Sequence, residues 1–141
     1  MNILEVIRRK GSEVLSVSPQ ASIGELVELL HQKNIGALVC LDREELVGIV
    51  SERDVMHGLA KMGADLLAQP VSSIMTTDVE TCEPTDKLES LAERMTQLRI
   101  RHLPVVEDGK LKAIVSIGDV VKQRLEDLQA ERDNLIDYMT S

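Results

Sequence analysis

The sequence has almost no aromatic residues: Tyr138 is the only one, and Phe and Trp are absent. It therefore lacks the aromatic platforms on which the bases of single-stranded nucleic acid stack. Positive charge is also scarce, with 16 Lys and Arg against 24 Asp and Glu and a formal net charge of −8. Nucleic acids and anionic membranes both attract basic surfaces, so we expect neither as a partner.

Long apolar runs and a cysteine framework are missing as well. No apolar stretch reaches the ~18–20 residues that a membrane-spanning helix needs, and the segment Met1–Glu5 lacks the organisation of a signal peptide. The two cysteines, Cys40 and Cys82, have no metal-ligand spacing, and we expect each to be a small buried thiol. These features favour a cytoplasmic protein.

What the chain does have is apolar content and an internal repeat. Its 141 residues are 43% hydrophobic, which suffices for the core of one compact unit or of two joined halves. At an offset of 65 residues, Val14–Val55 and Val79–Val120 align without a gap and agree at 13 of 42 positions. Two related halves are therefore expected.

Each copy predicts the element order β-α-β-β-α. In the first copy an extended piece at 14–18 leads to Pro19, which we place in the first turn of a helix that ends near Asn34. A continuous apolar strand at 35–41 and a return strand at 46–50 follow, and a second helix begins near Asp54. The second copy repeats this course, with Pro84 at the helix start and strands at 100–106 and 111–115.

The predicted fold class is α/β (α+β), with two such repeats packed by pseudo-two-fold symmetry, because neither sheet can cover its own apolar face. A short amphipathic helix at 2–10, with Ile3, Val6 and Ile7 inward, precedes the first repeat. The expected divisions are the first repeat with this helix at 1–62, a connector at 63–70, the second repeat at 71–126 and a helical extension at 127–141.

The tail from Val120 predicts a long helix. Its apolar residues recur at alternating spacings of four and three, and Arg132 interrupts them; they are Val121, Leu125, Leu128, Leu135 and Met139. This spacing fits a contact between two helices, and packing of the tail onto its own domain fits equally well.

A polar pair recurs in register, as Ser51 with Asp54 and Ser116 with Asp119, each directly after a predicted strand. A strand that turns into a helix leaves backbone N–H groups unpaired at the helix start, and these donors favour an anionic or hydroxyl-rich ligand. An Asp on the first turn can accept hydrogen bonds from the vicinal hydroxyls of a ribose. The alternative is that Ser and Asp are ordinary N-cap residues, but their recurrence favours two ligand sites.

The chain resembles a tandem pair of cystathionine-β-synthase-type (CBS) domains, a stand-alone Bateman module, from about Asn2 to about Glu126. The run Ile-Arg-His-Leu-Pro-Val-Val at 100–106 and the two Gly/Ala-Ile-Val-Ser-x-x-Asp stretches carry the resemblance. It implies a homodimeric sensor of adenosyl ligands, namely AMP, ADP or ATP and possibly NAD or S-adenosylmethionine. The ligands would lie in two clefts between the repeats.

Carried over by position, the resemblance assigns residues to both clefts. One would contain Asp119, Ser116 and Ile114, with Ser18, Ile35 and Gly36 from the first repeat. The other would contain Asp54, Ser51 and Ile49, with Glu83, Ile100 and Arg101 from the second repeat. Arg53 and His102 would add positive charge near it, and Pro104 is a further expected binding residue.

The two clefts are expected to differ. Arg101 and His102 have Gly36 and Ala37 as counterparts, and family members often use basic residues here on phosphates, which a guanidinium group suits. Glu83 stands where the family has Ser or Thr, and it either repels a phosphate or faces solvent. We expect the phosphate-rich ligand near Arg101 and a ligand of low charge near Asp119.

The leading hypothesis is a non-catalytic regulatory module that requires no cofactor and passes its signal to a separate client protein. A structural dimerisation module with vestigial ligand sites is the alternative. Catalysis is not expected, because the sequence shows no nucleophile–base–orienter set and no phosphate loop of the Walker type. The histidines at 31, 57 and 102 are scattered, so a metal site is not expected either.

Overall fold

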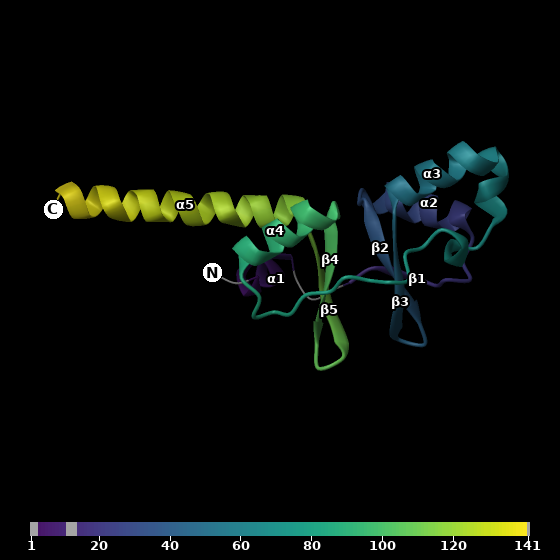
Figure 1. The fold of residues 1–141 in the computed structure, drawn as a ribbon, viewed down its shortest axis with the longest axis horizontal. Helices are drawn as coiled ribbons and strands as arrows, with labels where there is room; N and C mark the ends of the chain where they lie inside the picture. Colours follow the sequence, from purple (N-terminus) through teal and green to yellow (C-terminus); the bar gives the residue numbers. More distant parts are fainter. Residues whose placement is uncertain (1–2, 11–13, 141) are drawn as a thin grey trace. The chain divides into compact units, whose positions relative to one another are not determined.

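The computed structural model describes residues 3–10 and 14–140. The chain forms two compact units, of which one is Leu15–Glu80 and the other combines Met1–Val14 with Thr81–Ser141. Each unit holds one of the two sequence repeats, and Figure 1 labels its helices and strands.

The first repeat contains a three-stranded sheet in the order β1-β2-β3, made of Ser16–Val17, Ala37–Asp42 and Glu45–Ser51. Strand β1 pairs in parallel with β2, and β2 and β3 form an antiparallel hairpin in which Ala37 lies opposite Ser51. The helices of this unit are α2 (Ile23–Lys33), α3 (Glu52–Met62) and the short 3-10 helices η1 (Gly63–Ala68) and η2 (Val71–Ser73).

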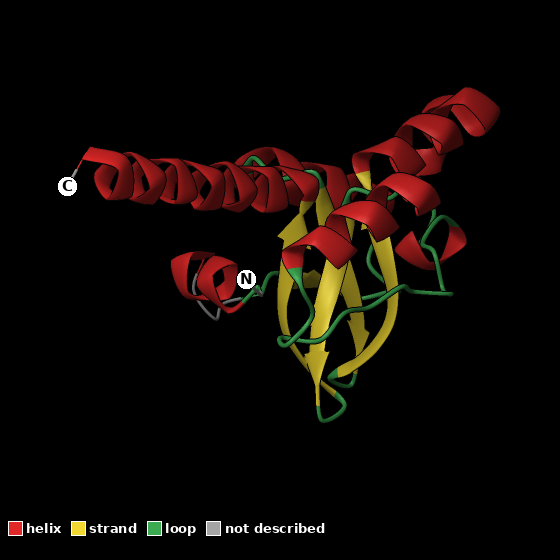
Figure 2. Ribbon diagram, turned by 60° about the vertical axis from the view of Figure 1, so that its left-hand side comes forward, coloured by secondary structure: helices red, strands yellow, loops and turns green. Residues whose placement is uncertain are grey.

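The second repeat follows the same plan. Strands β4 (His102–Glu107) and β5 (Lys110–Ser116) form a hairpin with His102 opposite Ser116, one of the yellow strand pairs in Figure 2. Cys82 bridges in parallel to Val105, where the first repeat has β1. The helices of this unit are α1 (Leu4–Lys10), α4 (Leu88–Leu98) and α5 (Ile117–Thr140). The predicted α/β order is therefore confirmed in both copies.

The predicted helix starts were wrong. Pro19 lies in a turn, and α2 begins only at Ile23, because the side chain of Ser22 caps the helix by accepting a hydrogen bond from Glu25 N at 3.1 Å. Pro84 likewise lies in a turn, ahead of α4. The predicted end of α2 was right, since Asn34 closes it with φ 51° in the left-handed conformation.

The helical segment that precedes each repeat in the sequence packs in the core of the other repeat: α1 joins the second repeat, and η2 joins the first. Ile3 and Val6, at the start of the chain, are buried in the core that contains Leu103 and Val115 of the second repeat. Val71, the counterpart of Val6 at the offset of 65, is fully buried in the core of the first repeat.

In these cores α1 packs with the second repeat and Val71 packs with the first, whereas the expected boundaries follow the order of the sequence and stay a prediction. The inward orientation of Ile3, Val6 and Ile7 is confirmed; Asn2, the expected first helical residue, lies outside the described residues. The expected connector at 63–70 packs tightly as well. Leu66 is 1% exposed, and a Cβ added at Gly58 would lie 2.8 Å from its side chain.

Helix α5 confirms the predicted long tail helix. The predicted helix ends at Ser141, which lies outside the described residues. All its residues from Leu128 to Thr140 are exposed, and Figure 1 shows this part, in yellow, extending beyond the rest of its unit. The predicted apolar seam is therefore open to solvent in the single chain rather than packed onto its own unit. None of the described helices, α5 included, is long and apolar enough to cross a membrane.

The two cysteines are buried thiols, as predicted. Burial, assisted by nearby Asp54, raises the pKa of Cys40 to about 11. Burial, followed by the charge of Asp86, raises the pKa of Cys82 to about 12. Both thiols therefore stay protonated near neutral pH and act as small apolar core residues.

Replacing Ile3 with Ala tests whether α1 belongs to the core of the second repeat. The buried side chain leaves a cavity when it is truncated, so the free energy of unfolding should fall by about 2–4 kcal/mol in urea denaturation. Leu4→Ala is the matched control, because Leu4 is the neighbouring residue and is 37% exposed. Equal losses for the two variants would contradict the docking of α1.

Candidate functional site

The recurring Ser and Asp lie where a strand runs directly into a helix, at β3–α3 and at β5–α5. The junctions have the same backbone geometry. Glu52 N donates to Gly36 O at 2.9 Å in the first repeat, and Ile117 N donates to Arg101 O at 2.8 Å in the second. Each helix start is thereby held beside the beginning of the preceding strand of its own repeat.

At the first junction, Ser51 and Asp54 form a capping box. Asp54 Oδ2 accepts hydrogen bonds from Ser51 N at 2.8 Å and Ser51 Oγ at 3.2 Å, and Asp54 N donates to Ser51 Oγ at 3.4 Å. Ser51 and Asp54 therefore do cap the helix, as the alternative interpretation states. The cap does not exclude a ligand, because within the described residues Asp54 Oδ1 has no hydrogen-bond partner.

Asp54 also lines a pocket of about 330 Å³ in the first unit, near the lower end of the roughly 300–1,000 Å³ typical of small-molecule sites. Its polar lining includes His57 and Lys61 from α3 and Gln69 and Ser73 from the segment after it. These four residues were not among the predicted site residues. Their spacing on α3 relative to Asp54 (i+3 and i+7) is a signal that could have identified His57 and Lys61.

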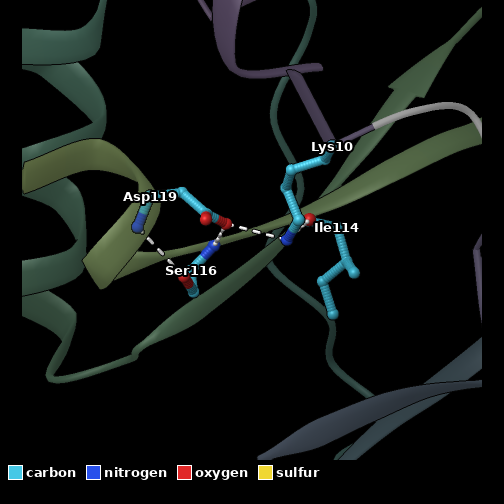
Figure 3. A network of polar contacts seen from close by, with 4 residues as sticks. All are labelled: Lys10, Ile114, Ser116 and Asp119. Atoms are coloured by element: carbon cyan, nitrogen blue, oxygen red, sulfur yellow. Dashed lines mark hydrogen bonds and ion pairs between the residues drawn. The ribbon is translucent and has the colours of Figure 1, made fainter. Parts of the chain in front are cut away.

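At the second junction, Asp119 Oδ2 accepts from Ser116 N at 2.9 Å, and Asp119 N donates to Ser116 Oγ at 3.1 Å. This carboxylate has one more partner: the ammonium group of Lys10, at the end of α1, donates to Asp119 Oδ2 and to Ile114 O, each at 2.8 Å (Figure 3). Sequence reasoning missed Lys10, which no motif connects to a residue 109 positions later.

The pKa of Asp119 reflects these contacts. Partial burial opposes ionisation and would raise the pKa, but the hydrogen bonds and charge of Lys10 and the hydrogen bonds of Ser116 outweigh it. The pKa of the Asp119 carboxyl therefore lies below its usual value, and the group is ionised near neutral pH.

Some predicted binding residues use their polar groups elsewhere in their own unit. The Ser18 hydroxyl donates to Gln20 Oε1 at 2.7 Å and accepts from Gln20 N at 3.2 Å. The backbone of Ile49 is paired with Thr76, at 3.0 and 2.8 Å. Pro104 is buried, and its carbonyl oxygen accepts from Cys82 N at 3.0 Å.

The remaining predicted residues lie nearer the surface. Ile35 and Ile100 are half-buried against their cores, and Arg53 and Arg101 are exposed. Within residues 3–10 and 14–140, no three His, Cys, Asp or Glu side chains gather as metal ligands would. Residues assigned to one cleft belong to different units, so their pairing across the repeats stays a prediction.

The lowered pKa of Asp119 predicts a pH-dependent contribution to stability. Because the folded pKa lies below the unfolded one, this contribution is fully present above the unfolded pKa of about 3.9 and is lost as the pH falls through the folded pKa. Asp119→Asn should therefore lose less unfolding free energy than the wild type between about pH 5 and pH 2 in chemical denaturation. Asp108→Asn, in the exposed β4–β5 turn, is the control, and wild-type behaviour of Asp119→Asn would contradict the assignment.

Comparison with known proteins gives a consistent result. The model of the CBS domain family matches the chain twice, at residues 5–61 and 71–126. The CBS domain-containing protein YhcV of Bacillus subtilis is 32% identical over 119 residues, which cover 84% of this chain and 84% of that protein.

Solved structures agree. The CBS-domain containing protein ATU1752 from Agrobacterium tumefaciens is 43% identical, with a TM-score of 0.86 over 88% of this chain and 99% of that one. The CBS domain pair of protein MJ0100, solved in complex with 5′-methylthioadenosine and S-adenosyl-L-methionine, is 23% identical, with a TM-score of 0.79 over 90% of this chain and 98% of that one.

Proposed function

Because the chain belongs to the CBS domain family and consists of two such repeats, we propose that it is a regulatory module that binds adenosyl ligands. The ligand class is AMP, ADP or ATP, with NAD and S-adenosylmethionine as further candidates. Binding occurs at two unequal sites, one around Ser51 and Asp54 and the other around Ser116 and Asp119. The signal passes to a separate client protein.

The observation that carries this proposal is the pair of Asp carboxylates at the two strand–helix junctions. In each, Oδ2 is used by the helix cap, while Oδ1 has no hydrogen-bond partner in the described part of the chain. An ionised carboxylate can accept several hydrogen bonds, so the oxygen that remains open can take a ribose hydroxyl without disrupting the cap.

The surroundings of the carboxylates support an adenosyl compound. Half-buried aliphatic side chains, Ile49 and Ile114, come from the strands that lead into the junctions. They provide an apolar surface for adenine in a chain with no Phe or Trp. The complex of MJ0100 shows that a CBS pair of the same fold holds adenosyl compounds in that protein.

Isothermal titration calorimetry with AMP, ATP, NAD and S-adenosylmethionine tests the proposal. The wild type should bind at least one of them, and Asp54→Asn and Asp119→Asn should each abolish one site. Asn keeps an oxygen that can cap the helix, but it lacks the charge that a ribose diol prefers.

Ser22→Ala is the matched control, because it removes the cap of α2 outside both sites. It should lower stability by about 1 kcal/mol and leave binding unchanged. Absence of binding for every adenosyl compound would contradict the proposal.

No enzymatic role is assigned to either site. Ser51 and Ser116 accept hydrogen bonds from the helix N–H groups of Asp54 and Asp119, so each hydroxyl is engaged in the cap of its helix. Ligand binding must then act through a difference in affinity between two arrangements of the protein.

The exposed seam of α5 supports a second candidate function, a dimerisation module. Its apolar residues are 44–80% exposed in the single chain; they are Val121, Leu125, Leu128, Leu135 and Met139. Their heptad spacing suits the seam of a two-helix coiled coil, and the occupant that this pattern favours is a second copy of α5. In the antiparallel register that pairs Val121 with Met139 and Leu125 with Leu135, Arg132 lies opposite Leu128. Parallel pairing in register would place two Arg132 side chains together, so the antiparallel arrangement is favoured.

Sedimentation velocity tests this contact. The wild type should be dimeric, and Leu128→Glu with Leu135→Glu should be monomeric, because charges would enter the seam. Ala130→Glu with Asn134→Glu is the control, since both residues are exposed and lie on the side of α5 opposite the seam. A monomeric wild type, or a dimer that persists in the seam variant, would contradict the contact.

A further inference from the structure

Lys10 is the only cation seen to contact either of the two junction carboxylates in the described residues. Its ammonium donates to Asp119 Oδ2 at 2.8 Å and to Ile114 O at 2.8 Å (Figure 3). An ammonium group has three N–H donors, so these two contacts leave one N–H for a further acceptor.

The backbone that carries Lys10 is held firmly in its unit. Ile3 and Val6 bury one face of α1 in the core of the second repeat. Arg9, beside Lys10, makes a bidentate pair with Glu126 of α5, with distances of 3.1 and 2.6 Å. The Lys10 side chain is 36% exposed and flexible, so its ammonium can move several ångströms from a fixed attachment point.

The first repeat lacks this cation at the equivalent position. The offset of 65 residues makes Met75 the counterpart of Lys10. Met75 is half-buried and lies against Gly48, where an added Cβ would be 2.7 Å from its sulfur. Asp54 accordingly accepts hydrogen bonds only from Ser51 among the described residues, so the two sites differ in the charge at the anchoring carboxylate.

We propose that Lys10 is a specificity-determining residue that makes the Asp119 site select adenosyl ligands with a negative charge close to the ribose. The proposal rests on the proposed function of this site. It reverses the expectation of a low-charge ligand near Asp119. That expectation considered only the residues that the family resemblance assigns to this cleft, and Lys10 is not among them.

The selection follows from the balance of charges. In the free protein the Lys10 ammonium neutralises Asp119. An uncharged nucleoside can place a ribose hydroxyl on the open Asp119 Oδ1, but it offers no charged acceptor to the third N–H of the ammonium. A nucleotide offers phosphate oxygens to the same ammonium, and charge-assisted hydrogen bonds of this kind are roughly twice as strong as neutral ones.

Lys10→Met tests the proposal, because Met is the residue that the first repeat has at the equivalent position, Met75. The measurement is calorimetric binding of AMP and of adenosine to an Asp54→Asn background, in which only the Asp119 site is intact. The AMP affinity should fall about tenfold or more, corresponding to one lost hydrogen bond between charged groups, while the adenosine affinity stays equal or rises. S-adenosylmethionine, whose sulfonium is positive beside the ribose, should gain affinity.

Lys110→Met, an exposed position at the start of β5, at the end of the strand far from Ser116, is the charge-matched control and should leave the AMP-to-adenosine ratio unchanged. Lys10→Gln provides a second variant with a polar side chain and should act like Lys10→Met. An unchanged ratio in both Lys10 variants would overturn the role of Lys10 alone. Absence of binding for every adenosyl compound in the wild-type chain would overturn the proposed function and the inference with it, whereas binding of S-adenosylmethionine without AMP would overturn the inference alone.

Discussion

Burial of the apolar face of each small sheet is the constraint on which the rest of the structure depends. A hairpin with one helix on either side leaves apolar residues uncovered, and in both repeats an additional helical segment covers them. The first repeat uses η1 and η2, with Leu66 and Val71, which follow it in the sequence. The second repeat uses α1, with Ile3 and Val6, from the opposite end of the chain. The two repeats are therefore covered in the same way, although the covering segment follows the first repeat in the sequence and lies at the opposite end of the chain from the second.

This exchange of segments makes the two sites unequal. Because α1 packs on the second repeat, its last residue, Lys10, reaches Asp119. The equivalent segment of the first repeat ends in Met75, which packs against Gly48 and leaves Asp54 to its cap. The same Ser-x-x-Asp geometry is thus placed in two electrostatic environments. A pair of sites with one anchor and different charges suits a sensor that distinguishes adenosyl compounds by the groups attached to the ribose.

Much of the fold could be predicted from the sequence because its signals are local. Apolar runs predicted the strands of both hairpins. The recurring Ser and Asp marked the two strand–helix junctions, where helix capping had been the alternative to a ligand site. Pro19 was misplaced because Ser22, three residues later, is the stronger cap. Lys10 could not be predicted, since its contact depends on which core α1 joins. The seam of α5 was visible as a pattern, but only the exposure of its residues shows that the single chain leaves it uncovered.

The central claim is that the two junction carboxylates anchor ribose and that Lys10 adds the charge selectivity of one of them. A crystal structure of the chain with bound AMP tests it most directly. We predict ribose hydroxyls within hydrogen-bond distance of the Asp119 carboxylate and the Lys10 ammonium on a phosphate oxygen. AMP bound with its ribose away from both Asp54 and Asp119 would contradict the account.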